Sequence, residues 1–180
     1  MTVEEIVALL ATGADVGLGA GLAVSQLDHA LQTAQFVAAA HPDDPELVAA
    51  ALVHDLGHLL PGTSDEAHAQ AGADAVRPVL GDRVAALVDL HVEAKRYLVA
   101  VEGWYRDRLA ADSTSSLARQ GGALSRASIS SFRANPLADD ALELRRADDR
   151  AKEAAARVEP LSHWVPLLQT LSRGGGRARA

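Results

Sequence analysis

The sequence predicts an all-α protein with a single domain, and three observations lead to this prediction. Hydrophobic residues make up 48% of the 180 residues but aromatic residues only 3%, so Ala, Leu and Val must fill the core. Alanine and the straight-chain residues are the strongest helix formers. Apolar residues recur at three- and four-residue spacing, and no segment alternates apolar and polar residues as a half-buried strand does. We expect the domain to cover residues 1–172, followed by a flexible, glycine-rich and basic tail over 173–180.

The expected helices cover residues 2–11, 24–40, 45–60, 64–77, 82–101, 116–120 and 137–158. The first helix is short and amphipathic, and the glycine-rich stretch 13–21 separates it from the second. Asp44 is suited to cap the third helix, with Pro45 at its first position. The third helix is apolar nearly all round, which predicts that it is deeply buried until Pro61 ends it.

Breaks in the apolar pattern determine where the later helices begin and end. Pro78 and Gly81 interrupt it before the long fifth helix. The sixth is a short helix that Gly121 and the glycine after it stop. The last helix begins after an Asn135-Pro136 pair, which disfavours helix at that point. These breaks give a chain of helices without internal repeats.

Charge and composition exclude several classes of partner. The net charge of -7 and the pI near 5.4 argue against a nucleic-acid or membrane-surface binder, since such proteins present basic surfaces. A local cluster of Lys, Arg and His can still receive a small anionic substrate. No apolar run is long enough to cross a membrane, and the N-terminus lacks the basic region of a signal peptide, so we expect a cytoplasmic protein. No cysteine is present, so any metal must be bound by nitrogen and oxygen atoms.

The most informative segment is LVAAALVHDLGHLL, residues 47–60. His54 and Asp55 lie within this otherwise apolar run, where an unpaired charge is strongly unfavourable. Adjacent residues of a helix point about 100° apart, so one ligand could touch both side chains. His58 follows one turn after His54 on the same face. This pair alone is compatible with a metal site and equally with a buried His–Asp hydrogen bond that fixes a helix crossing.

The other histidines favour the metal site. His29 lies at the centre of the preceding helix, and His68 and His91 each lie on one of the next two helical segments. One histidine per successive helix around a buried His-Asp pair is what a helix bundle needs to build an internal metal site. Imidazole and carboxylate suit iron, manganese or zinc, and Asp55 could bridge two such ions.

The last expected helix offers one further acid within LRRADDRAK, residues 144–152. Asp148 and Asp149 are both candidates to complete the metal site. They could equally form solvated salt bridges with Arg145 or Lys152 at helical spacing. The presence of the histidines favours the metal site.

These residues resemble a known family. The order His29, His54-Asp55, Asp148 resembles the H…HD…D signature of the HD superfamily of metal-dependent phosphohydrolases. A longer match resembles one branch of it, the mixed-valent diiron oxygenases that cleave hydroxylated aminoethylphosphonates and are distantly related to myo-inositol oxygenase. The matching segments are VSQLDHALQTA, LVAAALVHDLGHLL, DEAHAQAGA, HVEAKRYL, SLARQGG and LRRADDRAK. The resemblance implies an HD-domain helical bundle with an internal metal site.

The resemblance implies a role for each candidate residue. The metal ligands would be His29, His54, Asp55 and Asp148 for one iron, and His68 and His91 for the second, with Asp55 bridging. Asp148 is preferred over Asp149 because Lys152 follows it by four residues, as in the family. The substrate residues would be His58 and Lys95, which grip the phosphonate, and Ser113, Ser116 and Gln120, which complete the pocket. Lys95 also lies one helical turn after His91, so its spacing alone lets it reach the cavity.

The sequence departs from the family just before the first ligand. The phosphonate enzymes carry a tyrosine and a glutamate in the loop that leads to this helix, where the present chain has Gly19 and Leu22. Leucine cannot form a hydrogen bond with a substrate amine. Ala147 also replaces a tryptophan that is usual in the family. These differences indicate a substrate that lacks the cationic amine.

We therefore expect a diiron oxygenase that binds a mixed-valent Fe(II)/Fe(III) pair and uses O2 to cleave a small hydroxylated phosphonate or similar anion. His58 and Lys95 would be its catalytic residues. The alternative is a phosphohydrolase in which Mn or another divalent metal activates water to attack a phosphate ester or nucleotide. A metal-binding module without enzymatic activity is a third hypothesis. We expect a monomer or homodimer, with no nucleic acid and no membrane as partner.

Overall fold

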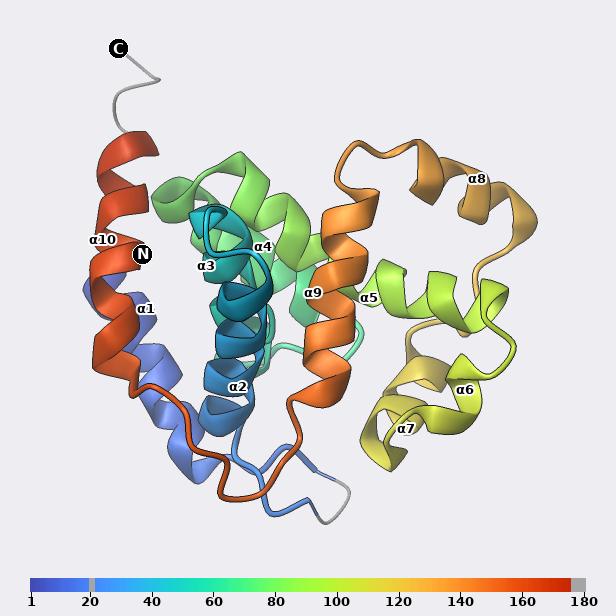
Figure 1. The fold of residues 1–180 in the computed structure, drawn as a ribbon, viewed down its shortest axis with the longest axis horizontal. Helices are drawn as coiled ribbons and strands as arrows, with labels where there is room; N and C mark the ends of the chain where they lie inside the picture. The colour runs from blue at the N-terminus through green and yellow to red at the C-terminus, as the bar shows by residue number, and fades with distance from the viewer. Residues whose placement is uncertain (20–21, 176–180) are drawn as a thin grey trace.

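The computed structural model describes residues 1–19 and 22–175, and every regular element within them is a helix (Figure 1). The α-helices are α1 (Val3–Thr12), α2 (Gln26–Ala40), α3 (Pro45–Val53), α4 (His68–Leu80), α5 (Asp82–Val101), α6 (Tyr105–Arg108), α7 (Ala111–Arg119), α8 (Arg126–Ala134), α9 (Ala138–Arg150) and α10 (Leu161–Gly175). Two short 3-10 helices, η1 (Gly13–Asp15) and η2 (Leu56–Leu59), complete the set. The expected all-α, single-domain fold is confirmed. In these ranges no helix is both long and apolar enough to span a membrane.

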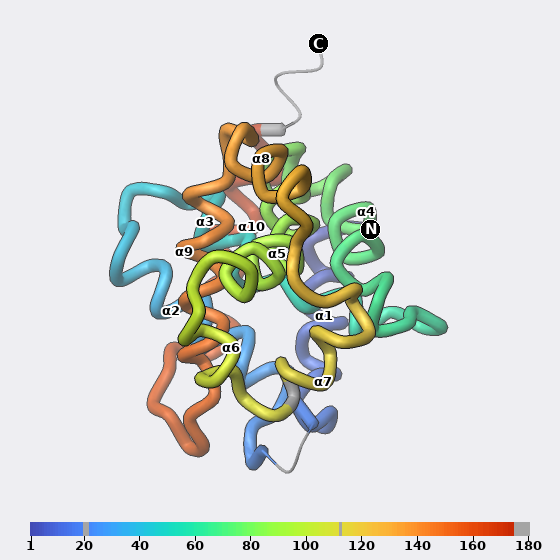
Figure 2. Tube along the Cα trace, turned by 90° about the vertical axis from the view of Figure 1, so that its right-hand side faces the viewer, coloured from blue at the N-terminus to red at the C-terminus, as the bar shows by residue number. Residues whose placement is uncertain are grey.

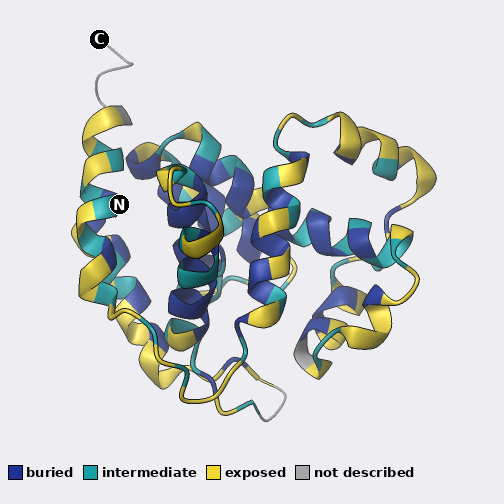
Figure 3. Cartoon of the chain, viewed as in Figure 1, coloured by how far each residue is buried: buried dark blue, intermediate teal, exposed yellow. Residues whose placement is uncertain are grey.

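Helix α3 lies at the centre of the molecule (Figures 1 and 3). All its residues from Leu47 to Val53 are buried, as its apolar sequence predicts. Helices α2, α5 and α9 pack against it, and α4 packs along α5. Helices α1 and α10 cover one side of this bundle, whereas α6, α7 and α8 lie together on the opposite side (Figure 1) and face the viewer in Figure 2.

Side-chain caps fix where the central helices begin. The Asp44 carboxylate accepts a hydrogen bond from the Leu47 amide at 3.0 Å, and Pro45 is the first residue of α3, so this predicted cap is confirmed. At the start of α2, Ser25 and Asp28 each accept from the other's backbone amide in a capping box. Such caps satisfy backbone N–H groups that have no partner inside the helix.

The predicted helix over residues 45–60 is wrong in its second half. Helix α3 ends at Val53, and the chain turns at Asp55 (φ -100°, ψ 10°) into the 3-10 helix η2. The cause is the close approach of α4 at Gly57, where an added Cβ would lie 1.9 Å from the carbonyl oxygen of His68. The break places His54, Asp55 and His58 in a tight turn rather than on one α-helical face.

Other predicted boundaries also shift. Helix α4 begins at His68 rather than near Ser64 and continues through Pro78, which removes only one hydrogen bond close to the helix end. The predicted helix over 137–158 ends at Arg150. Helices α6, α8 and α10 were not among the expected elements. Helix α10 includes 173–175, the first residues of the expected tail; the remainder, 176–180, lies outside the described residues.

Candidate metal centre

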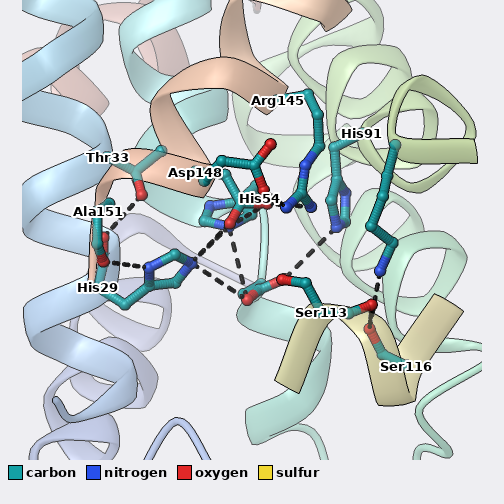
Figure 4. Close-up of polar contacts among 12 residues, drawn as sticks. His29, Thr33, His54, His91, Ser113, Ser116, Arg145, Asp148 and Ala151 are labelled. Carbon is teal, nitrogen blue, oxygen red and sulfur yellow. Dashed lines mark hydrogen bonds and ion pairs between the residues drawn. The ribbon is translucent and has the colours of Figure 1, made fainter. Parts of the chain in front are cut away.

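Six predicted ligands from four α-helices and one turn meet inside the bundle, and Figure 4 labels four of them, His29, His54, His91 and Asp148. They are His29 on α2, His54 and Asp55 in the turn after α3, His68 at the start of α4, His91 in the middle of α5 and Asp148 on α9. The four histidines are at most 2% exposed. Their donor atoms form two trios, each within 4.8 Å: one contains His29, His54 and Asp148, and the other Asp55, His68 and His91.

Backbone carbonyl groups orient all four imidazoles. The Nδ1 atom of His29 lies 2.7 Å from the Ala151 carbonyl oxygen. The other three carbonyl contacts are His54 Nδ1 to Ala51 at 2.9 Å, His68 Nδ1 to Asp65 at 2.5 Å and His91 Nδ1 to Val88 at 2.6 Å. A carbonyl accepts only, so Nδ1 must carry the proton in each ring. Each Nε2 therefore presents a lone pair to the centre, which is the tautomer a metal requires.

The Nε2 atoms then face one another at distances that call for a cation. His29 and His54 approach to 3.2 Å, and His68 and His91 to 3.1 Å. Burial lowers the pKa of His54 and of His68 to about 4, so both are neutral at pH 7. Two facing lone pairs without a proton repel each other, whereas a shared cation would stabilise them. The donor set of imidazole nitrogens and carboxylate oxygens thus fits first-row metal ions such as iron, manganese or zinc.

The Asp55 carboxylate lies between the two trios. Its Oδ1 atom is 3.5 Å from Nε2 of both His68 and His91. Its Oδ2 atom faces the other trio, 3.6 Å from His29 and 3.5 Å from His54. Although burial opposes ionisation, the surrounding histidines hold the pKa of Asp55 well below its usual range. One oxygen directed to each trio is the arrangement of a bridging carboxylate.

On α9 the structure separates the two adjacent acids. Asp148 is buried and its Oδ1 atom lies 3.3 Å from His29 Nε2. Asp149 instead pairs with Arg145 and accepts a hydrogen bond from the Tyr105 hydroxyl. Arg145, which is 3% exposed, also contacts Asp148 Oδ2 at 2.5 Å. Asp148 therefore faces the candidate metal centre, and Arg145 is a buried partner of that carboxylate.

A cavity of about 180 Å³ opens next to the trios. Its described lining residues are Leu18, Gln26, His29, Asp55, His58, Asp65, His68, His91, Lys95, Ser113, Ser116, Gln120, Arg145, Asp148 and Lys152. All five predicted substrate residues are in this set. Gly19 and Leu22 are not, and among the described residues of this loop, 13–19 and 22–25, it is Leu18 that lines the cavity.

Cationic side chains on the cavity wall are held by serines of α7. Lys95 Nζ donates to Ser116 Oγ at 2.8 Å (Figure 4), and Lys152 Nζ donates to Ser113 Oγ at 3.2 Å. Burial, together with the nearby Arg145 charge, lowers the pKa of Lys95 to about 8. The cavity thus combines a metal-type donor set with cations suited to an anion.

His58 and the missed residues complete the wall. The ring of His58 stacks on His68, with centroids 3.9 Å apart and planes inclined by 13°. Asp65 pairs with Arg119 of α7 at 2.9 Å. The sequence-based predictions did not include five of the lining residues among the site residues: Leu18, Gln26, Asp65, Arg145 and Lys152. Their helical or loop positions carry no signal that distinguishes them from surface residues.

Comparisons with known proteins agree with this geometry. Residues 27–151 match the family described as HD domain. The chain is 38% identical over 150 residues to "Hydroxymethylphosphonate dioxygenase" of Gimesia maris, covering 78% of this chain and 74% of that protein. It is 30% identical to "[1-hydroxy-2-(trimethylamino)ethyl]phosphonate dioxygenase (glycine-betaine-forming)" of Leisingera caerulea, covering 84% of this chain and 81% of that protein. The chain therefore belongs to the HD domain family.

Proposed function

We propose that the protein is an oxygenase that uses O2 and a mixed-valent pair of iron ions to cleave the carbon–phosphorus bond of a small hydroxylated phosphonate. The observation that carries the proposal is the pair of buried His/Asp trios with the Asp55 carboxylate between them. One metal ion is enough to activate a water for hydrolysis, although two-metal hydrolytic sites also exist. The second trio, which includes His68 and His91, favours a dinuclear centre.

In this proposal His29, His54 and Asp148 would hold one iron, His68 and His91 would hold the other, and Asp55 would be available to both. When bound, the iron pair would supply the redox chemistry with O2 that no side chain of this chain can provide. The backbone carbonyls that fix the four Nδ1–H groups keep the ligands in place. Arg145, which also lines the cavity, neutralises the Asp148 carboxylate.

The substrate anion would be received by the cationic wall. Lys95 and Lys152 already donate to serine hydroxyl groups, so an incoming phosphonate can replace or share these acceptors. Ser113, Ser116 and Gln120 add neutral hydrogen-bonding groups, and His58 lies beside His68. The lysine charges would orient the headgroup and leave the hydroxyl-bearing carbon toward the trios.

The overall reaction balances with one O2. Hydroxymethylphosphonic acid and O2 contain the atoms of formic acid and phosphoric acid, so the C–P bond breaks while carbon is oxidised and O2 is reduced. The name of the Leisingera caerulea relative also states a carboxylic acid product, glycine betaine. The chain supplies orientation and charge for this step.

The test begins with anaerobically purified protein. We expect about two irons per chain and an EPR signal of a mixed-valent pair after partial reduction. Oxygen uptake should then equal phosphate release when hydroxymethylphosphonate is added. The competing phosphohydrolase would require Mn or another divalent metal and would release phosphate from phosphate esters or nucleotides without consuming oxygen. That result, or one metal per chain, would reject the oxygenase.

A further inference from the structure

Two amide side chains on the cavity wall have buried oxygen atoms without a partner. Gln26 and Gln120 both line the cavity, and the Oε1 atom of each finds no hydrogen-bond partner among the described residues. Buried polar atoms are nearly always hydrogen-bonded in folded proteins, because leaving one unpaired is unfavourable. A molecule bound in the cavity could therefore provide the hydrogen-bond partner that each of these oxygens lacks. The proposed function already includes Gln120 but not Gln26.

Gln26 is placed next to the first trio by its position on α2. It is the first residue of that helix and precedes His29 by three residues, so the two side chains share a helical face. Its backbone amide donates to the Val16 carbonyl at 2.7 Å, and the Leu18 amide donates to Val24 at 2.9 Å. This short pairing brings Leu18 onto the cavity wall together with Gln26.

Among the described residues of the cavity wall, every carboxylate is already engaged, so none is available to pair with a cationic substrate. The lining acids are Asp55, Asp65 and Asp148. Asp55 and Asp148 belong to the two trios, and Asp65 is paired with Arg119 at 2.9 Å. A substrate ammonium group would therefore meet lysines, an apolar leucine and neutral amides, and none of these offsets its desolvation.

We propose that Gln26 is a substrate-binding residue for a small hydroxylated phosphonate, and that the described cavity wall, whose carboxylates are all engaged, disfavours a cationic substituent. The Oε1 atom of Gln26 would accept a hydrogen bond from the substrate hydroxyl group, while Leu18 limits the space beside it. The inference rests on the proposed function for the nature of the substrate. It narrows the substrate class to compounds of the size and charge of hydroxymethylphosphonate, consistent with a cavity of about 180 Å³.

The test compares two substrates in four proteins. The substrates are hydroxymethylphosphonate and [1-hydroxy-2-(trimethylamino)ethyl]phosphonate, and the proteins are wild type, Gln26→Glu, Gln26→Leu and the control Gln35→Glu. The control makes the same change on the same helix, at a side chain that bonds to the backbone of Arg157 and Glu159 instead of lining the cavity. Metal content and thermal unfolding are measured for each protein, and kcat and KM for each substrate.

Wild type should prefer hydroxymethylphosphonate. Gln26→Glu should shift the ratio of the two kcat/KM values by about tenfold or more toward the cationic substrate, because a carboxylate repels the anion and attracts the ammonium group. Gln26→Leu should lower kcat/KM for hydroxymethylphosphonate by about tenfold through KM, with no gain for the cationic substrate. Gln35→Glu should leave the ratio unchanged.

An unchanged ratio in Gln26→Glu with native metal content would overturn the inference. If Gln26→Glu loses metal, the Gln26→Leu variant becomes the test. A kcat/KM for hydroxymethylphosphonate equal to that of wild type in Gln26→Leu would reject the role of Gln26. If wild type consumes no oxygen with either compound, the proposed function fails by itself. Anaerobic calorimetry with the same two phosphonates then still measures whether Gln26→Glu changes the ratio of their dissociation constants.

Discussion

The metal-binding side of the cavity and its substrate-facing side are built in different ways. The candidate ligands come from long core helices, α2, α4, α5 and α9, and from the turn after the buried α3. Each histidine is fixed by a backbone carbonyl. The substrate-facing side uses α7, a nine-residue helix on the periphery (Figure 1), and the loop that contains Leu18.

This difference separates binding of the metal from choice of substrate. A ligand in the core cannot change without loss of packing, whereas a peripheral helix or loop tolerates substitution. Changes on the first side should therefore alter metal content and stability. Changes on the second side should alter KM and substrate preference while the metal remains bound.

The largest contrast is expected between the two neighbouring acids of α9. Asp148→Asn replaces a carboxylate of the first trio and should abolish metal binding at that site and all oxygen uptake. Asp149→Asn changes a residue that contacts Arg145 and Tyr105 instead, and should retain metal with a modest loss of activity. Metal analysis and oxygen uptake measure both effects. Loss of metal in Asp149→Asn with retention in Asp148→Asn would reverse the assignment.

A backbone change in the core should be nearly as severe. Gly57→Ala would place a Cβ 1.9 Å from the His68 carbonyl oxygen, so α4 must move and carry His68 with it. We expect a loss of roughly 3–5 kcal/mol in the free energy of unfolding, together with weaker metal binding. Gly103→Ala is the control, because nothing lies within 4 Å of its added Cβ. Equal unfolding midpoints for the two variants in thermal denaturation would contradict this account.

Lys95 tests the substrate-facing side. Lys95→Ala removes a buried cation that donates to Ser116, and loss of a charged hydrogen bond should raise KM about 10- to 100-fold. Iron content should stay at the wild-type value. Lys95→Arg restores the charge and should recover part of the affinity. A loss of iron in Lys95→Ala would show that the two sides are not separable.

Sequence patterns predicted the core side of the site better than the substrate side. His29 and His91 were identifiable because each is a polar residue on a helix with a clear apolar pattern. His54 and Asp55 were identified as a pair, but their turn geometry was not, since it arises from the contact between Gly57 and His68. That contact joins segments whose proximity only the folded chain reveals.

The substrate side depends on tertiary contacts that leave no periodic signal. Arg145 occurs in an arginine-rich helix, and its burial against Asp148 and Asp149 follows from the packing of α9. Leu18 and Gln26 reach the cavity through a backbone pairing between Gly17 and Ser25. Ser113, Ser116 and Gln120 were selected by family resemblance, and all three line the cavity.

A pH profile should distinguish the two sides further. The pKa of Lys95 is lowered to about 8, so the side chain is cationic below this pH and loses its charge as the pH rises through it. If substrate binding needs the Lys95 ammonium group, kcat/KM should decrease above about pH 8, by up to about tenfold per pH unit. The decrease should be absent in Lys95→Arg, since arginine stays protonated. A profile that is identical in both proteins would assign the decrease to another group.

The smallest effect is expected at the hydroxyl group that positions Lys95. Ser116 Oγ accepts from Lys95 Nζ at 2.8 Å and donates to the Ser113 carbonyl at 3.2 Å. Ser116→Ala should raise KM about fivefold, because a neutral hydrogen bond contributes about 1 kcal/mol. Ser115→Ala, on the exposed side of α7, is the matched control and should leave KM unchanged. In the Lys95→Ala background Ser116→Ala should have little further effect, because the two side chains act through one contact; full additivity would mean that Ser116 binds the substrate independently.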